Sequence, residues 1–140
     1  MITIVLSAAV IVCAVVDART GRIPNVITGP AVVVVVALSA ADPATAVAAA
    51  VCAAPYAIAF ARGLCGGGDV KLAVVCGGML GDPGLAAMTV VGAAIVTGIV
   101  LVARRTRVVA HGPALVAVTL AWLVIAVVGP SGTIDTCCVG

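Results

Sequence analysis

The sequence predicts an all-α membrane protein, a polytopic bundle of about six transmembrane helices in a single domain spanning residues 1–140. Hydrophobic residues make up 64% of the chain, whereas charged residues make up 9% and aromatic residues 2%. In a soluble domain, roughly a quarter of the residues are charged. This chain therefore has too few charged residues to cover the surface of a soluble globular domain. The hydrophobicity excludes a disordered chain, and a net charge of +2 provides no basic face for nucleic acid.

Six uncharged apolar stretches are separated by short segments that contain Gly, Pro or charged residues. They cover residues 1–16, 26–41, 44–61, 70–80, 84–103 and 113–129. Several are shorter than the ~20 residues that cross a bilayer, so we expect the helices to extend past these limits. Alternatively, the fourth stretch lies on the membrane surface and only five spans form. No alternation of apolar and polar residues suggests a β-barrel, and a helix satisfies its own backbone in lipid.

The first stretch is expected to be a retained helix. A secretory signal carries positive charge before its apolar run, whereas here Arg19 and Arg22 follow it. In a six-span chain, all seven basic residues fall on one side of the membrane: Arg19, Arg22, Arg62, Lys71, Arg104, Arg105 and Arg107. Basic residues collect on the cytoplasmic side, so both termini are expected outside the cytoplasm, in a multi-pass protein of the inner (plasma) membrane.

Two aspartates near the cytoplasmic boundary are the candidate catalytic residues. Asp17 follows the first apolar stretch, and Asp69 follows three glycines just before the fourth. An ionisable residue at this depth is costly unless it faces water or a partner. Two carboxylates that share a site tend to keep one proton between them. The charged carboxylate can then activate water, while the neutral one supports the carbonyl oxygen of a peptide bond.

Each aspartate also has a structural interpretation. Asp17 could form an ion pair with Arg19 or Arg22 at the lipid headgroups, and Asp69 could be the N-cap of the fourth helix. The catalytic interpretation is favoured because both acids lie on the same side, each beside a Gly or Pro break, in a chain with five acidic residues.

Three motifs resemble, in the same order, those of the type IV prepilin peptidases, which are intramembrane aspartic peptidases. The motifs are Asp17-Ala-Arg-Thr-Gly-Arg-Ile-Pro24-Asn25, Gly66-Gly-Gly68-Asp69-Val-Lys71-Leu and His111-Gly-Pro-Ala-Leu115. The Gly-x-Gly-Asp segment alone is a weak signal in a chain with 16 glycines, but its combination with an Asp upstream of Ile-Pro-Asn is specific. The resemblance covers nearly the whole chain.

The resemblance implies an aspartic endopeptidase with Asp17 and Asp69 as its catalytic pair. The supporting motif residues are Pro24, Asn25, Gly66, Gly68 and Lys71. The implied substrate is a type IV pilin-like precursor, whose basic leader is cleaved at the cytoplasmic membrane face. Larger members also carry an N-terminal cytoplasmic segment and methylate the new N-terminus. A chain of 140 residues is therefore expected to cleave without methylation and without a cofactor.

Three polar residues near these motifs have more than one interpretation. Lys71 lies about 200° around a helix from Asp69, so its amine is expected to reach lipid or substrate rather than that carboxylate. Asn25 is more simply a cap of the second helix than a group that orients a catalytic residue. His111 could carry protons, but a single loop histidine is more often exposed.

The six cysteines lack the spacing of a zinc site, so no metal is expected. They lie at positions 13, 52, 65, 76, 137 and 138. Those at 13, 52 and 76 are expected to be small apolar packing residues. The adjacent Cys137 and Cys138 would permit an intermolecular disulfide in an oxidising compartment, consistent with a homo-oligomer. Gly77 and Gly81 are a candidate site of close helix packing.

Two other function classes are kept as alternatives. The chain could be a non-enzymatic membrane protein, either a small proton or cation transporter or an assembly subunit of a secretion system. A transporter would commonly show an internal repeat and acids near the bilayer midplane, and neither is evident. A presenilin-like peptidase that cuts within a substrate's membrane helix is disfavoured by the Ile-Pro-Asn motif.

Overall fold

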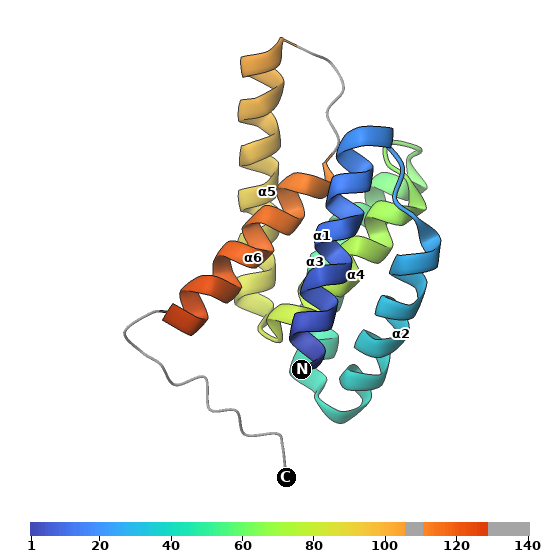
Figure 1. Cartoon of the computed structure of the whole chain (residues 1–140), viewed down its shortest axis with the longest axis vertical. Helices are drawn as coiled ribbons and strands as arrows, with labels where there is room; N and C mark the ends of the chain where they lie inside the picture. The colour runs from blue at the N-terminus through green and yellow to red at the C-terminus, as the bar shows by residue number, and fades with distance from the viewer. Residues whose placement is uncertain (106–110, 129–140) are drawn as a thin grey trace.

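The chain folds into six α-helices and, within the described residues 1–105 and 111–128, contains no strand (Figure 1). In this computed structural model, the helices are α1 (Ile2–Thr20), α2 (Asn25–Ala41), α3 (Pro43–Ala61), α4 (Gly67–Leu80), α5 (Pro83–Arg104) and α6 (Gly112–Val128). Three of them, α1, α3 and α5, are long and apolar enough to cross a membrane, and α2 and α6 are shorter apolar helices. The all-helical membrane fold is therefore confirmed.

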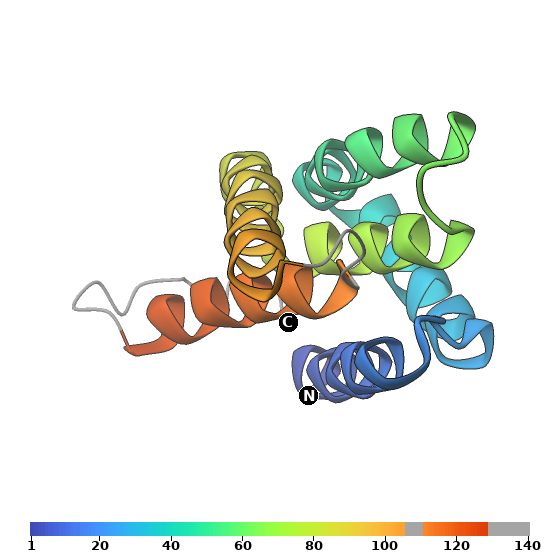
Figure 2. The same ribbon diagram turned by 90° about the horizontal axis from the view of Figure 1, so that it is seen from above.

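Helix α4 lies at the centre of the bundle and packs against all five other helices (Figure 2). Small residues permit this arrangement. A Cβ atom at Gly77 would lie 2.5 Å from the Ala48 carbonyl oxygen of α3, and one at Gly78 would overlap Val35 of α2. Helix α4 thus lies within the helix bundle rather than beside it.

Several helix ends fall at Gly and Asp positions of the sequence. Asp42 and Asp82 are the N-caps of α3 and α5, and a proline follows each in the first helical turn, where its missing N–H is tolerated. Gly21 and Gly81 end α1 and α4 with φ angles of 63° and 66°, a left-handed conformation that glycine adopts without strain. Close packing at Gly77 is thus confirmed, but Gly81 serves as a cap.

Three cysteines, Cys13, Cys52 and Cys76, are buried among the helices. Each is at most 1% exposed and belongs to the apolar core. They fill small volumes between helices, as the sequence predicted.

The basic residues of the described segments gather at one end of the bundle. Figure 1 shows the C-terminal ends of α1, α3 and α5 and the N-terminal end of α4 at the same end, and the basic side chains there are exposed. This grouping agrees with the charge pattern from which the cytoplasmic face was predicted. Arg107, Asp135, Cys137 and Cys138 lie outside the described residues, so the disulfide-linked homo-oligomer stays a prediction.

The Asp42 cap should stabilise the fold in a pH-dependent way. Its carboxylate accepts hydrogen bonds from the Thr45 hydroxyl (2.6 Å) and from the Ala44 and Thr45 amides (3.0 and 3.1 Å), and these donors lower the pKa of Asp42. A lowered carboxyl pKa stabilises the fold above the unfolded-state pKa, and this contribution is lost as the pH falls through the folded-state pKa. Asp42→Ala is therefore expected to lower the melting temperature at pH 7, and its deficit relative to wild type should begin to shrink as the pH falls below about 4.

Thermal unfolding in detergent between pH 3 and pH 7 measures this difference. Asp42→Asn, which keeps a side-chain acceptor, is the matched control and should lose less stability at pH 7. An Asp42→Ala deficit that is the same at every pH would contradict a role for the charged cap.

Candidate active site

Asp17 lies in the last turn of α1 and is buried. The helix continues to Thr20, three residues beyond this position, so Asp17 lies within the helix rather than at its end. Its side chain is 6% exposed, and its Oδ2 atom has no hydrogen-bond partner among the described residues. Neither Arg19 nor Arg22 pairs with it, and both arginines are exposed. The interpretation of Asp17 as a headgroup ion pair is therefore wrong.

Asp69 is the third residue of α4 and is half-buried. The N-cap of this helix is Gly66, so the interpretation of Asp69 as the N-cap is also wrong. Its Oδ2 atom accepts a hydrogen bond from the Gly66 N–H at 3.1 Å, and its own N–H donates to the Gly66 carbonyl at 3.1 Å. The Asp69 carboxylate is thereby fixed in the first turn, where the helix dipole favours negative charge.

The two aspartate motifs pack directly against each other. A Cβ atom at Gly68 would lie 2.8 Å from Cβ of Ile23, so Gly68 brings the start of α4 against the Ile-Pro-Asn turn. Pro24, the next residue, is the N-cap of α2. Its carbonyl oxygen accepts hydrogen bonds from the Ile27 and Thr28 N–H groups at 3.1 and 3.2 Å. The segments that carry Asp17 and Asp69 are therefore neighbours in the fold.

Gly68→Ala is expected to destabilise the protein and to slow its activity, because the added Cβ would force the two motifs apart. Overpacking of this kind costs about 1–3 kcal/mol of unfolding free energy. Gly67→Ala is the matched control, since its Cβ would meet Phe60 at an ordinary 3.6 Å, and alanine favours the helix. Denaturant unfolding of both variants tests this contact, and equal stabilities would contradict it.

Lys71 and Asn25 join α4 to the start of α2. The Lys71 amine donates to the Asn25 Oδ1 atom at 2.9 Å, and both side chains are exposed. Asn25 makes no side-chain cap of α2, so the expectation that it caps this helix is wrong. Lys71 forms no ion pair with Asp69 among the described residues, and its amine bonds to Asn25, a protein partner that the sequence interpretation did not expect.

His111 is half-buried and bonded at both ring nitrogens, so the expectation of an exposed loop histidine is wrong. Its Nδ1 atom lies 2.7 Å from the Thr97 hydroxyl of α5, and its Nε2 atom lies 2.8 Å from the Tyr56 hydroxyl of α3. Burial lowers the pKa of the His111 imidazole, and the negative charges of Asp69 and Asp17 oppose this shift. The imidazole thus lies within electrostatic reach of both candidate catalytic acids.

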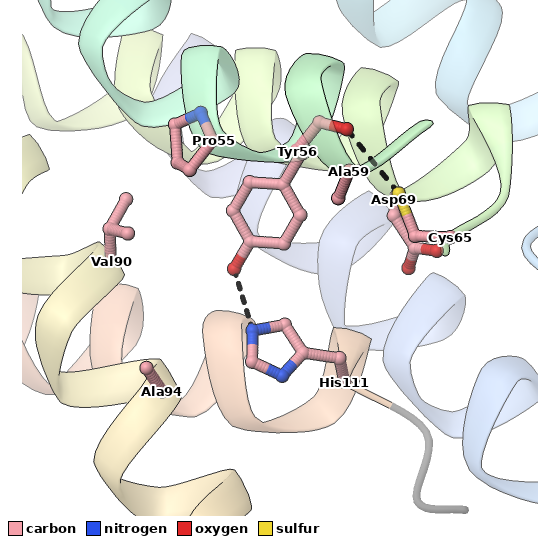
Figure 3. A pocket seen from close by; sticks show the side chains of 8 residues that line it. All are labelled: Pro55, Tyr56, Ala59, Cys65, Asp69, Val90, Ala94 and His111. Carbon is pink, nitrogen blue, oxygen red and sulfur yellow. Dashed lines mark hydrogen bonds between the residues drawn. The ribbon is translucent and has the colours of Figure 1, made fainter. Parts of the chain in front are cut away.

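A cavity of about 260 Å³ opens beside Asp69 and His111 (Figure 3). Its walls come from α3, α4 and α5, together with Cys65 before α4 and His111 before α6. The lining residues are Pro55, Tyr56, Ala59, Cys65, Asp69, Val90, Ala94 and His111. Most of these side chains are small or apolar, whereas Asp69, Tyr56 and His111 provide polar groups. Apolar walls with a few polar groups are typical of a ligand-binding cavity.

Tyr56 and Thr97 are site residues that the sequence interpretation missed. Tyr56 is the chain's single tyrosine, within an apolar stretch, which is a signal that a polar partner lies nearby. Thr97 carries no comparable signal in the sequence. Within the described residues, no three His, Cys, Asp or Glu side chains are grouped as metal ligands.

These features define a helical integral membrane protein that has a buried aspartate, Asp17, and a cavity lined by a second aspartate, Asp69. Residues 4–130 match the model of the type IV leader peptidase family. The chain therefore belongs to this family and is a peptidase. A search of curated proteins and a search of solved structures found no match.

Proposed function

We propose that the protein is an aspartic endopeptidase that cleaves the basic leader from type IV pilin-like precursors. The observation that carries this proposal is the packing of Gly68 against Ile23, which unites the Asp17 and Asp69 motifs. Membership of the leader peptidase family supports the substrate class. A transporter or assembly subunit would not need two interacting carboxylates beside a cavity at one edge of the bundle.

The surroundings of the two acids suggest different roles for them. Asp69 accepts a backbone N–H in the first turn of α4, which favours its charged form. Asp17 is buried and has an unpartnered oxygen, and an isolated buried charge is costly, which favours its neutral form. In the proposed reaction, Asp69 takes a proton from the attacking water, and Asp17 donates its proton to the carbonyl oxygen, which gives a tetrahedral diol. Asp69 then gives its proton to the leaving nitrogen as the C–N bond breaks, and Asp17 takes back a proton from the diol, so that both acids return to their starting states.

A cysteine peptidase is the competing chemistry, since Cys65 and His111 line the same cavity. A nucleophilic cysteine needs a thiolate and a nearby base. Here the Cys65 thiol donates to the Tyr56 carbonyl at 3.3 Å, while His111 bonds to the Tyr56 hydroxyl. Burial and the charge of Asp69 raise the pKa of the Cys65 thiol. These features favour the carboxylates as the reacting groups.

The finer features of the proposal follow from the charge pattern and the family resemblance. The single domain lies in the inner (plasma) membrane, with Asp17 and Asp69 facing the cytoplasm, where a basic leader remains. The proposed reaction needs no cofactor and leaves the new N-terminus unmethylated. Because the rate needs one charged and one neutral carboxylate, it should fall at both pH extremes.

A reconstituted cleavage assay tests the proposal. The purified chain in lipid nanodiscs is mixed with a synthetic precursor in which a basic leader precedes an apolar helix of about 20 residues, together with a methyl donor. Mass spectrometry of the product should show one new, unmethylated N-terminus. An uncut precursor would contradict the peptidase assignment, and a methylated product would contradict the restriction to cleavage.

A further inference from the structure

The His111 side chain links three helices at the edge of the site. It directly precedes α6 and is bonded to Thr97 of α5 and Tyr56 of α3 through its two ring nitrogens. Figure 3 shows the bond to Tyr56. Its partners lie 14 and 55 residues away in the chain. Both partners are hydroxyl groups, which can donate or accept. A neutral imidazole therefore satisfies both bonds, since one nitrogen donates and the other accepts.

The residue after His111 lies against the candidate acid on α1. Gly112 is buried, and a Cβ atom there would lie 2.6 Å from Oδ2 of Asp17 and 3.3 Å from Leu72 of α4. The backbone at the start of α6 is thus one wall of the space that holds the Asp17 carboxylate. Any movement of this backbone would change the position and surroundings of that carboxylate.

We propose that His111 is a positioning residue that fixes the start of α6 to α3 and α5 and thereby holds the Gly112 backbone against Asp17. This inference deepens the proposed peptidase function and rests on it. His111 acts through Gly112, and its contribution is to keep the two carboxylates in their reactive arrangement. Removal of a group that only orients the reacting groups lowers kcat more than it changes KM.

The charge of His111 adds a pH signature. The titratable groups around its ring are Tyr56 from α3, Asp69 from α4, Asp17 from α1 and Cys65 from the segment before α4. When His111 binds a proton in acid, its positive charge favours the charged forms of the two carboxylates. Because His111→Ala removes this positive charge from the site, the acidic limb of the rate profile should move to higher pH.

The experiment compares kcat and KM across pH for nanodisc-embedded variants on the synthetic precursor. Thr97→Val and Tyr56→Phe each remove one hydroxyl and should lower kcat by about 2- to 10-fold, the effect of one hydrogen bond. His111→Ala should lower kcat by about 10- to 100-fold and move the acidic limb of the rate profile to higher pH. Adding Thr97→Val to His111→Ala should cause no further loss of kcat, because the bond that Thr97 makes is already absent. His111→Gln, which can still bond to Tyr56, should recover part of kcat.

Thr89→Val is the matched control on the same helix. The Thr89 hydroxyl donates only to the Leu85 carbonyl of α5, at 2.8 Å, so kcat and the pH profile should stay at wild-type values. A wild-type kcat in His111→Ala would overturn the proposal, as would a raised KM at unchanged kcat. Lowered thermal stability with an unmoved acidic limb would also overturn it, because that result describes a purely structural contact.

The peptidase mechanism and the positioning role of His111 fail in different ways. If Asp17→Asn and Asp69→Asn still cleave the precursor, the peptidase mechanism itself is wrong. If both are inactive while the His111, Thr97 and Tyr56 variants match wild type, the peptidase mechanism stands and the positioning role alone is lost.

Discussion

Asp17→Asn and Asp69→Asn are each expected to reduce the rate of precursor cleavage by roughly 10³- to 10⁴-fold, because a general acid or base contributes on that scale. Each substitution keeps the shape of the side chain but removes its capacity to exchange a proton. The amide in Asp69→Asn would still offer an oxygen to the Gly66 N–H, which Asp69 accepts at 3.1 Å, so the helix end should remain intact. At position 17, a neutral amide replaces a carboxylic acid that we propose to be neutral already.

Cleavage by these variants is best measured as a single-turnover rate, with insertion checked by size-exclusion chromatography in detergent. The double variant should be no slower than either single variant, because residues that act as a unit are not additive. Asp82→Asn is the matched control. Asp82 caps α5 by accepting the Leu85 N–H at 2.7 Å, and its asparagine variant should cleave at the wild-type rate. Cleavage that survives in a well-inserted Asp17 or Asp69 variant would favour the transporter or assembly-subunit alternative.

The helices were predictable because Gly, Pro and charged residues clearly separate the apolar stretches of this sequence. Apolar stretches at 26–41, 44–61 and 84–103 correspond to helices that begin and end within one residue of those limits. In lipid the backbone N–H and C=O groups must form their hydrogen bonds within the protein. An uncharged stretch between Gly, Pro and Asp residues is therefore expected to form a helix. The prediction was less accurate at α1, which includes Asp17 and Arg19, because charged residues alone do not end a helix.

The candidate acids were predictable for a related reason, whereas their neighbours were not. A charged side chain within a membrane-spanning segment is rare, so each one is a candidate functional residue. The partners of His111 are an ordinary threonine and the single tyrosine, and the Lys71 to Asn25 bond joins residues 46 positions apart. Periodicity and composition carry no information on such contacts, which depend on how helices that are distant in the sequence pack together.

Gly112→Ala is expected to reduce cleavage by about 100-fold, the order of loss that follows from a misplacement of about 1 Å in an active site. The added Cβ would lie 2.6 Å from Oδ2 of Asp17, too close for any real contact. Leu72, on the other side at 3.3 Å, is fully buried in α4 and has little freedom to move. The Asp17 carboxylate or the start of α6 must therefore shift, and either movement changes the proposed dyad.

Gly98→Ala provides the matched control, since its Cβ would meet nothing within 4 Å and alanine is favoured in α5. It should be as active as wild type and no less stable. A folding double-mutant cycle separates the clash from the chemistry. Gly112→Ala should cost about 1–3 kcal/mol of unfolding free energy in the wild-type background and much less in Asp17→Ala, where the clashing carboxylate is absent. An equal cost in both backgrounds would show that Gly112 does not support Asp17, and it would remove the contact through which His111 is proposed to act.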